Sequence, residues 1–232
     1  AAGDIVKILT PARGWQSVGN PAAALPGAAV ETDAELRRRQ AISTALPSLT
    51  VFEGTLGAVA SIPGVTRSRG YENDGGVPDA DGIPGHSICM VVEGGDTAAI
   101  AAKKGPGAGT YGTTEALVRD KFGVPNVIKF FRPVETPVYA TVTIRPFPGY
   151  LSTTGESIRK NVAEHINGLN IGDDVSLSRL YSPANAANAA SYDIESITLG
   201  TSQGAQSAAN VAVAFNAVAS CSVDRVKLVV RP

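Results

Sequence analysis

The sequence contains little charge, few cysteines and few histidines. Charged residues make up 18% of the 232-residue chain, against about 25% in an average soluble domain, and the formal net charge is −1. Without an excess of positive charge, the chain has no field that would gather nucleic acid or anionic lipid. No apolar run reaches the roughly 18 residues needed to cross a bilayer. The composition predicts a soluble, non-secreted protein whose neutral surface suits packing against other proteins.

Two cysteines, Cys89 and Cys221, are too few for a disulfide framework. Cys89 lies in the apolar run 88–92, where a small buried hydrophobe fits, so both residues are interpreted as reduced thiols in a cytosolic product. The chain begins without Met, and its first residues, 1–8, resemble the middle of a strand. The N-terminus lacks a basic-then-apolar signal segment. We expect the sequence to be the C-terminal piece of a longer protein.

Three capping boxes, each a Thr followed three residues later by a Glu, mark the starts of helices. The boxes are Thr32/Glu35, Thr50/Glu53 and Thr153/Glu156. Together with apolar residues at helical spacing, they predict helices over 33–46, 51–61 and 154–167, and a further apolar cluster predicts a fourth over 176–186.

Alternation of apolar and polar residues predicts strands between these helices. It is clearest over 138–145, where the even-numbered residues should be buried and the odd-numbered ones should face water. Weaker patterns predict strands over 65–71, 87–92, 113–119, 127–131, 192–199 and 226–230. Gly123, Val124 and Pro125 predict a hairpin turn.

The order of these elements predicts an α+β fold with two small α+β units, each with a short, mostly antiparallel sheet covered by helices. Pro133 and Pro137 make 133–137 the best candidate linker. The predicted divisions are an N-terminal strand and connection (1–31), a first unit (32–134) and a second unit (135–232).

Two glycine motifs resemble catalytic or cofactor-binding signatures. Residues 107–112 match G-x-G-x-x-G, but a dinucleotide loop needs a strand before it and a helix after it, and here that context is reversed. Residues 200–204 match the G-x-S-x-G of a nucleophile elbow around Ser202. Because both histidines, His86 and His165, precede that serine, the order of an α/β-hydrolase triad is excluded. A turn and a polar surface loop explain the two motifs better.

The remaining polar clusters do not match known ligand spacings. The acidic loop 72–82 fails as an EF-hand, because Pro84 and Met90 would occupy the positions of the turn glycine and the bidentate glutamate. Residues 37–39 are all Arg, but consecutive helical residues point about 100° apart and form no single phosphate-binding face. Neither histidine has a second at ligand spacing. We therefore predict no catalytic, cofactor-binding or metal-binding residues.

An ordered set of short motifs is more informative. The motifs are residues 14–24 (GWQSVGNPAAA), 31–39 (ETDAELRRR), 62–65 (IPGV), 105–112 ending in GTYG, 148–150 (PGY), 171–174 (IGDD) and 192–194 (YDI). From about residue 14 to the C-terminus this set resembles the baseplate J-like family of contractile phage tails, which includes Mu-like and P2-like wedge proteins. One departure is the short segment 96–104, where relatives have a longer helix.

The resemblance implies a wedge subunit without enzymatic activity or cofactor. Such a subunit assembles with sixfold symmetry round a hub in the virion tail, links tube, sheath and fibre network, and is made in the bacterial host cytoplasm. Its partners would be other copies of itself and neighbouring wedge, hub and sheath proteins, with no nucleic acid, membrane or small-molecule substrate.

Two alternatives remain. A tail-associated hydrolase acting on cell wall or capsule would need paired carboxylates or a nucleophile in a cleft, and no such pair stands out. A carbohydrate-binding receptor module would need exposed aromatic platforms, whereas most of the aromatic residues here fall in apolar patterns.

Overall fold

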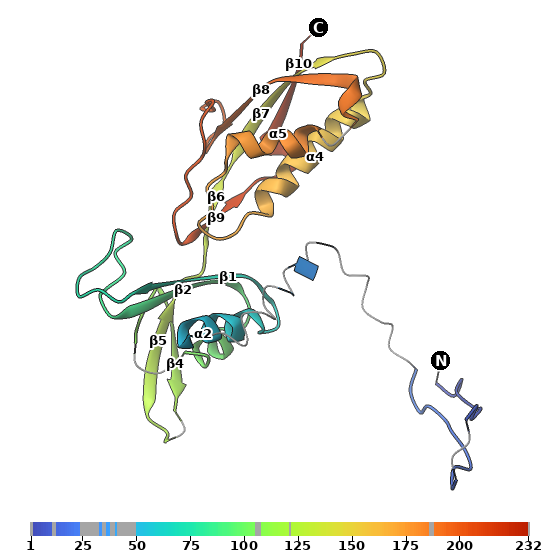
Figure 1. Ribbon diagram of the computed structural model, residues 1–232, viewed down its shortest axis with the longest axis vertical. Coiled ribbons are helices and arrows are strands. Elements are labelled where there is room, and N and C mark those ends of the chain that lie inside the picture. Colours follow the sequence, from blue (N-terminus) through green and yellow to red (C-terminus); the bar gives the residue numbers. More distant parts are fainter. Residues whose placement is uncertain are drawn as a thin grey trace. The chain divides into compact units, whose positions relative to one another are not determined.

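The computed structural model describes residues 2–10, 13–23, 33, 36, 37, 40, 50–104, 108–120, 122–185 and 188–231. The chain divides into two compact units, Ala1–Ala41 and Ile42–Pro232. The second unit has the α+β architecture expected from the sequence (Figure 1). Of the helix predicted over 33–46, only residues 33, 36, 37 and 40 are described, and these four are helical. The Thr32/Glu35 box lies outside the described residues.

The first part of the second unit carries two small sheets. Its elements are α2 (Val51–Ala60), β1 (Val65–Asn73), β2 (Ser87–Gly94), α3 (Thr97–Ala101), β3 (Gly109–Tyr111), β4 (Thr114–Arg119) and β5 (Pro125–Phe130). One sheet has the order β1-β2-β3, with β1 antiparallel and β3 parallel to β2. β4 and β5 form a separate antiparallel ribbon. Figure 1 shows this ribbon in light green.

The remainder of the unit forms a second α+β arrangement. Its elements are β6 (Val134–Pro137), β7 (Tyr139–Pro146), α4 (Ser152–Asn167), α5 (Leu177–Asn185), a short 3₁₀ turn (Ala189–Ser191), β8 (Tyr192–Gly200), β9 (Ala217–Ser220), a second 3₁₀ turn (Val223–Arg225) and β10 (Val226–Val230). β7 lies between antiparallel β8 and parallel β10, and β6 pairs in parallel with β9. The longest pairings in the described part of the chain are antiparallel, as expected, and the parallel pairings involve short strands.

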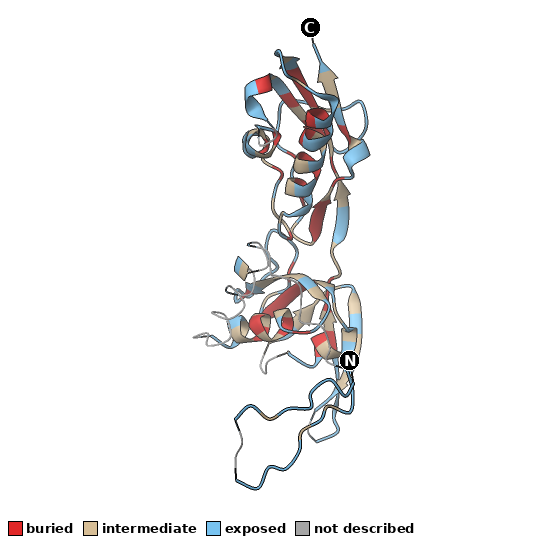
Figure 2. Ribbon diagram, turned by 90° about the vertical axis from the view of Figure 1, so that its right-hand side faces the viewer, coloured by how far each residue is buried: buried red, intermediate tan, exposed pale blue. Residues whose placement is uncertain are grey.

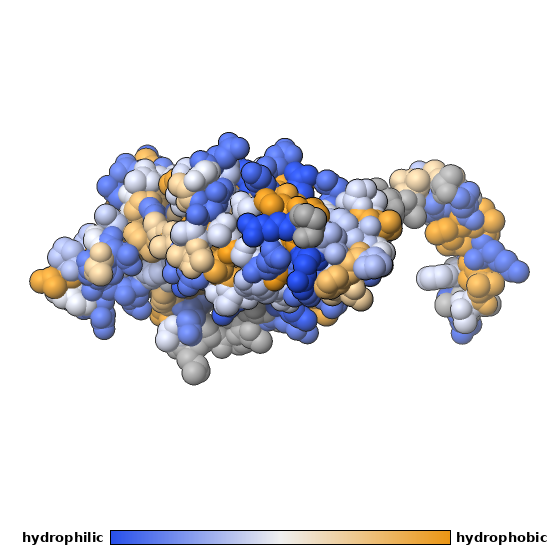
Figure 3. All heavy atoms as spheres, turned by 90° about the horizontal axis from the view of Figure 1, so that it is seen from above, coloured by the Kyte–Doolittle hydropathy of each residue, from blue (hydrophilic) through white to orange (hydrophobic). Residues whose placement is uncertain are grey.

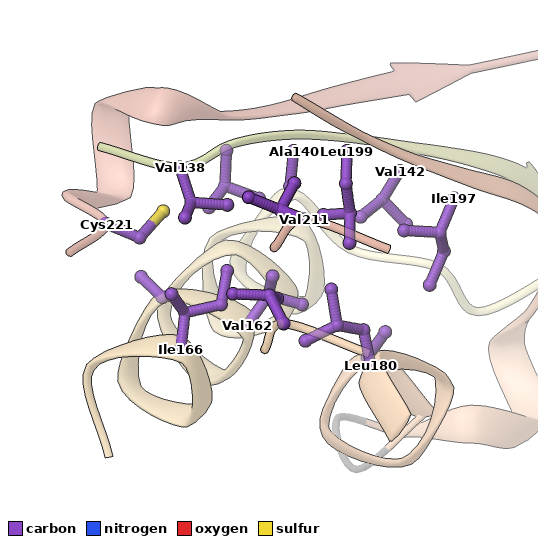
Figure 4. Close-up of a cluster of buried hydrophobic side chains, with 14 of the residues drawn as sticks. Val138, Ala140, Val142, Val162, Ile166, Leu180, Ile197, Leu199, Val211 and Cys221 are labelled. Carbon is purple, nitrogen blue, oxygen red and sulfur yellow. The ribbon is translucent and has the colours of Figure 1, made fainter. Parts of the chain in front are cut away.

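The largest core lies between the β7 sheet and helices α4 and α5. Figure 4 shows side chains from β7 and β8 facing side chains from the two helices. Val142 and Leu199 point down from the sheet, and Val162 and Leu180 point up from α4 and α5 (Figure 4). The helical spacing of Ile158, Val162 and Ile166 produces this packing, since residues four apart share one helix face.

β2 is buried on both faces from Ser87 to Val92. Figure 2 colours the chain by burial, with buried residues in red. On one face Met90 and Val92 pack with residues of α2, α3 and β5. On the other face Cys89 and Val91 join a cluster that includes Ile171 and Val218. That second cluster therefore takes residues from both sides of the predicted boundary at 134/135.

Polar side chains of β1 connect the same two regions. Arg67 makes two hydrogen bonds of 2.7 Å with Glu93 and also donates to the backbone oxygens of Asn167 and Leu169. Two residues on, Arg69 lies 2.8 Å from the Asp173 carboxylate. Tyr71 donates to the Phe215 carbonyl over 2.8 Å. Residues 67, 69 and 71 share one face because side chains alternate along a strand, and we call them the β1 ladder.

Three local expectations differ from the structure. The predicted linker is mostly strand β6, because a partner distant in sequence, β9, supplies its hydrogen bonds. α4 begins at Ser152 with Leu151 at the N-cap, so Thr153 lies inside the helix and the capping-box prediction there is wrong. Thr143 is buried rather than wet, since Ser196 and Val229 flank it in the central strand of its sheet. The Thr50 cap is confirmed by a 3.2 Å hydrogen bond from the Glu53 backbone.

Candidate assembly surfaces

The turn between β4 and β5 is held by one carboxylate. Asp120 Oδ1 accepts hydrogen bonds of 2.9 Å from the backbone N–H groups of Phe122 and Val124. The backbone N–H of Gly123 donates to the Asp120 carbonyl, and Gly123 has φ +83°, which suits glycine. These hydrogen bonds join the ends of β4 and β5 at a tight turn. It fulfils the turn predicted from Gly123, Val124 and Pro125.

The same ribbon exposes apolar side chains. Phe122 is 78% exposed and Val124 53% exposed at the turn. On the outer face of the strands, Leu117 (61% exposed) lies opposite Val127 (52% exposed). Beside this pair, Lys129 and Glu115 form an ion pair of 2.8 Å. A hydrogen-bonded turn that presents apolar side chains to solvent is suited to protein contact rather than to chemistry.

A second set of exposed apolar residues lies in the unit Ala1–Ala41. Two hydrogen bonds join the start of this segment to Asn20. The Gly3 backbone N–H donates to the Asn20 carbonyl, and the Ile5 backbone N–H donates to the Asn20 side chain. Its exposed apolar side chains are Ile5, Val6, Leu9 and Trp15. The stretch 4–8, which resembles a strand in sequence, has no strand assignment here.

The glycine motif at 107–112 has a packing role where it is described. Gly109–Tyr111 forms β3, a strand the sequence did not predict. A side chain at Gly112 would collide with the backbone of Phe130 in β5. Glycine is thus needed for close approach of two chain segments. Gly107 itself lies outside the described residues.

Ser202 lies in an exposed loop after β8, as its motif suggests. The next residues, Gln203 and Gly204, line a hollow on the solvent side of the β7 sheet together with Asp224 and Arg225. The residues lining that hollow include no histidine and no cysteine. The hollow therefore offers Ser202 no general base of those types.

The acidic loop uses its side chains to hold its own backbone. Asp79 Oδ1 accepts from the backbone N–H groups of Asp81 (3.0 Å) and Ile83 (2.8 Å). The Asn73 amide donates to the carbonyls of Val77 and Ile83, and the Ile83 side chain is fully buried. This loop is folded around Ile83 rather than around an open carboxylate cluster.

The remaining candidates stay apart. His86 is in the left-handed region (φ 56°) before β2, whereas His165 lies on α4. Arg37 is exposed, and Arg38 and Arg39 lie outside the described residues. Within the described ranges, no three His, Cys, Asp or Glu side chains gather closely enough to hold a metal ion. No described helix is both long enough and apolar enough to span a bilayer.

Burial controls the chemistry of the two cysteines, which form no disulfide. Burial raises the pKa of the Cys89 thiol to about 12 and that of Cys221 to about 11. Both are therefore protonated at neutral pH and poor nucleophiles. Burial also raises the pKa of Tyr71, whose hydroxyl donates the hydrogen bond to the Phe215 carbonyl.

Sequence reasoning did not identify the exposed apolar residues of the hairpin. The sequence predicts a strand over 127–131, but alternation alone does not say which face of a two-stranded ribbon will be covered. A usable signal is the turn sequence from Asp120 to Val124, in which an Asp and a Gly flank an aromatic residue.

On the face of residues 42–232 shown in Figure 3, hydrophobic and hydrophilic residues are interspersed.

A scan against models of known protein families found no match, and a search of curated proteins found no significantly similar one.

Proposed function

We propose that this chain is a structural subunit of the baseplate of a contractile phage tail. It acts by binding further copies of itself and neighbouring wedge, hub and sheath proteins, and it catalyses no reaction. The observation that carries the proposal is the β4–β5 hairpin, whose turn is fixed by Asp120 and whose apolar side chains are exposed. Burying one such side chain in an interface contributes about 1.5–3 kcal/mol.

One motif behind the family resemblance, IGDD at 171–174, supports a structural role because its residues connect distant segments of the fold. Gly172 has φ +69°, and a side chain there would meet the Tyr71 hydroxyl. Next to it, Asp173 pairs with Arg69 of the β1 ladder. Asp174 accepts a 2.9 Å hydrogen bond from the Val213 backbone. These residues position backbone segments and do not converge on a pocket.

Co-purification with tail proteins tests the proposal. The tagged 232-residue chain, co-expressed with the other tail genes of the same phage, should retain at least one wedge, hub or sheath protein. Phe122→Ser should weaken that retention, because it removes an aromatic side chain from the turn while Asp120 keeps the backbone in place. Val77→Ser is the matched control, since Val77 is 73% exposed in a different loop. A chain that retains no tail protein would refute the proposal.

The hydrolase alternative has a direct test. Ester, peptide and glycan substrates should give background rates with the parent chain and with Ser202→Ala, because the hollow beside Ser202 contains no histidine. Turnover that is abolished by Ser202→Ala would favour the enzyme instead.

A further inference from the structure

Among the residues that the structure describes, β4 pairs with β5 alone, so no described strand lies along its other edge. Helix α3 packs against the inner face of the ribbon, because Ile100 shares a cluster with Phe130, whose partner Thr114 lies on that face. An unpaired edge of this kind can accept a strand from another molecule.

Three observations show which backbone groups point to that edge. The Asp120 N–H donates to the Val124 carbonyl over 3.0 Å, so this pair is a hydrogen-bonded one. The Lys129 N–H points away from β4, since it donates to Thr110 Oγ1 over 3.0 Å. Pro125 lacks an N–H altogether. Hydrogen-bonded and non-hydrogen-bonded pairs alternate along antiparallel strands. The N–H and C=O groups of residues 115, 117 and 119 therefore face the open edge.

The charges along that edge are self-complementary. Glu115 and Arg119 flank Leu117 at equal spacing on the outer face. When two copies of β4 run antiparallel with Leu117 opposite Leu117, each Glu115 lies opposite an Arg119. We propose that a second copy of this chain docks on the outer edge of β4 in this register, forming a continuous sheet β5-β4-β4-β5.

Other registers are less favourable. Shifting the pairing by four residues in either direction sets two Glu115 or two Arg119 side chains opposite each other, and a parallel arrangement aligns like charges. A shift by two residues sets Leu117 opposite a charged residue. In the proposed register, Val127 and Leu117 of each copy form one apolar row across four strands. Each Glu115 then lies between its own Lys129 and the opposing arginine.

This contact joins copies in pairs. A twofold interface uses the same surface on both partners and closes on itself, so it does not by itself generate a ring. The inference rests on the proposed function, because the pairing would be one of the contacts between copies of an assembly subunit. The pairing and the assembly role are tested separately. Pairing is measured on the purified chain alone, and the assembly role is measured by co-purification with tail proteins.

Charge exchange tests the pairing. Sedimentation velocity from roughly 10 µM to 1 mM, the range of weak contacts, should show reversible dimers of the parent chain. Arg119→Glu sets glutamates opposite each other and should weaken dimerisation about tenfold. A second variant, Glu115→Arg with Lys129→Glu, keeps an ion pair inside the hairpin but sets arginines opposite each other, and should weaken it similarly. A mixture of the two variants restores opposite charges and should dimerise like the parent.

Cross-linking tests the register. Leu117→Cys should give a covalent dimer with mild oxidation or a short bismaleimide, because facing residues in such a pair lie about 5.5 Å apart. Arg119→Cys should not cross-link to itself but should cross-link to Glu115→Cys when the two are mixed. Buried Cys89 and Cys221 should give no background. A monomeric parent chain, dimers unaffected by Arg119→Glu, or equal cross-linking of Leu117→Cys and Arg119→Cys alone would overturn the proposal.

Discussion

Strands β2 and β7 are both central in three-stranded sheets, but they are buried in different ways. β7 presents Ala140, Val142 and Ile144 to one large core, while most of its other face is partly covered or exposed. β2 is buried continuously from Ser87 to Val92, because a different cluster packs on each face. A strand covered on one side shows alternation in its sequence, and one covered on both sides shows an apolar run.

The largest expected loss of stability comes from a substitution on the buried face of β7. Val142→Asp places an unpaired charge among fully buried side chains and should cost about 3–5 kcal/mol of unfolding free energy. Thr141→Asp, on the partly covered opposite face, is the matched control and should cost under about 1 kcal/mol. Urea denaturation measures both. Equal losses would mean that the two faces of β7 are equally buried.

The next prediction concerns the two-sided burial of β2. Val91→Ala and Val92→Ala each remove buried methyl groups, but from different clusters, and each should cost about 2 kcal/mol. If either substitution left the urea midpoint unchanged, the corresponding face of β2 would not be packed in solution. Alanine substitutions at Thr141 and Val142 of β7 should differ strongly in the same experiment, whereas those at Val91 and Val92 should not.

A smaller effect should follow from weakening the β1 ladder, which binds the segment that covers the second face of β2. Tyr71→Phe removes a single hydrogen bond to the Phe215 carbonyl and should cost about 1 kcal/mol. The same substitution should also accelerate chemical labelling of the Cys89 thiol, because Phe215 and Val218 pack in the same cluster as Cys89. Labelling of Cys221 serves as the internal control, because this cysteine belongs to the β7 core. Equal acceleration at both thiols would indicate global opening instead.

The last effect is confined to alkaline pH. The ordinary thiol pKa is 9.0, and burial raises that of Cys89 to about 12. Between these values the unfolded chain loses the thiol proton and the folded chain retains it, so unfolding free energy should fall as pH rises from 9 towards 12. Cys89→Ala should reduce that slope without changing its sign, because Cys221 and Tyr71 titrate in the same direction. Melting temperatures at stepped pH measure the slope.

The candidate surface was only partly predictable. The turn at Gly123 is recognisable because its signal is local: a glycine, which can adopt the positive φ found there, and a nearby proline. The exposure of Leu117 and Val127 was not, because it depends on which elements cover the ribbon. The self-complementary spacing of Glu115 and Arg119 is visible in the sequence, but it acquires meaning only when β4 is known to be an edge strand.

The sequence by itself determined the α+β class, the longer strands and the start of α2 at Thr50, since those signals arise between residues a few positions apart. Only the tertiary structure decided the short strands β3, β6 and β9, the burial of Thr143 and the covering of the second face of β2. A strand of three or four residues has too few side chains to show a period. It is stabilised by hydrogen bonds to segments distant in sequence, and those partners are specified only once the chain has folded.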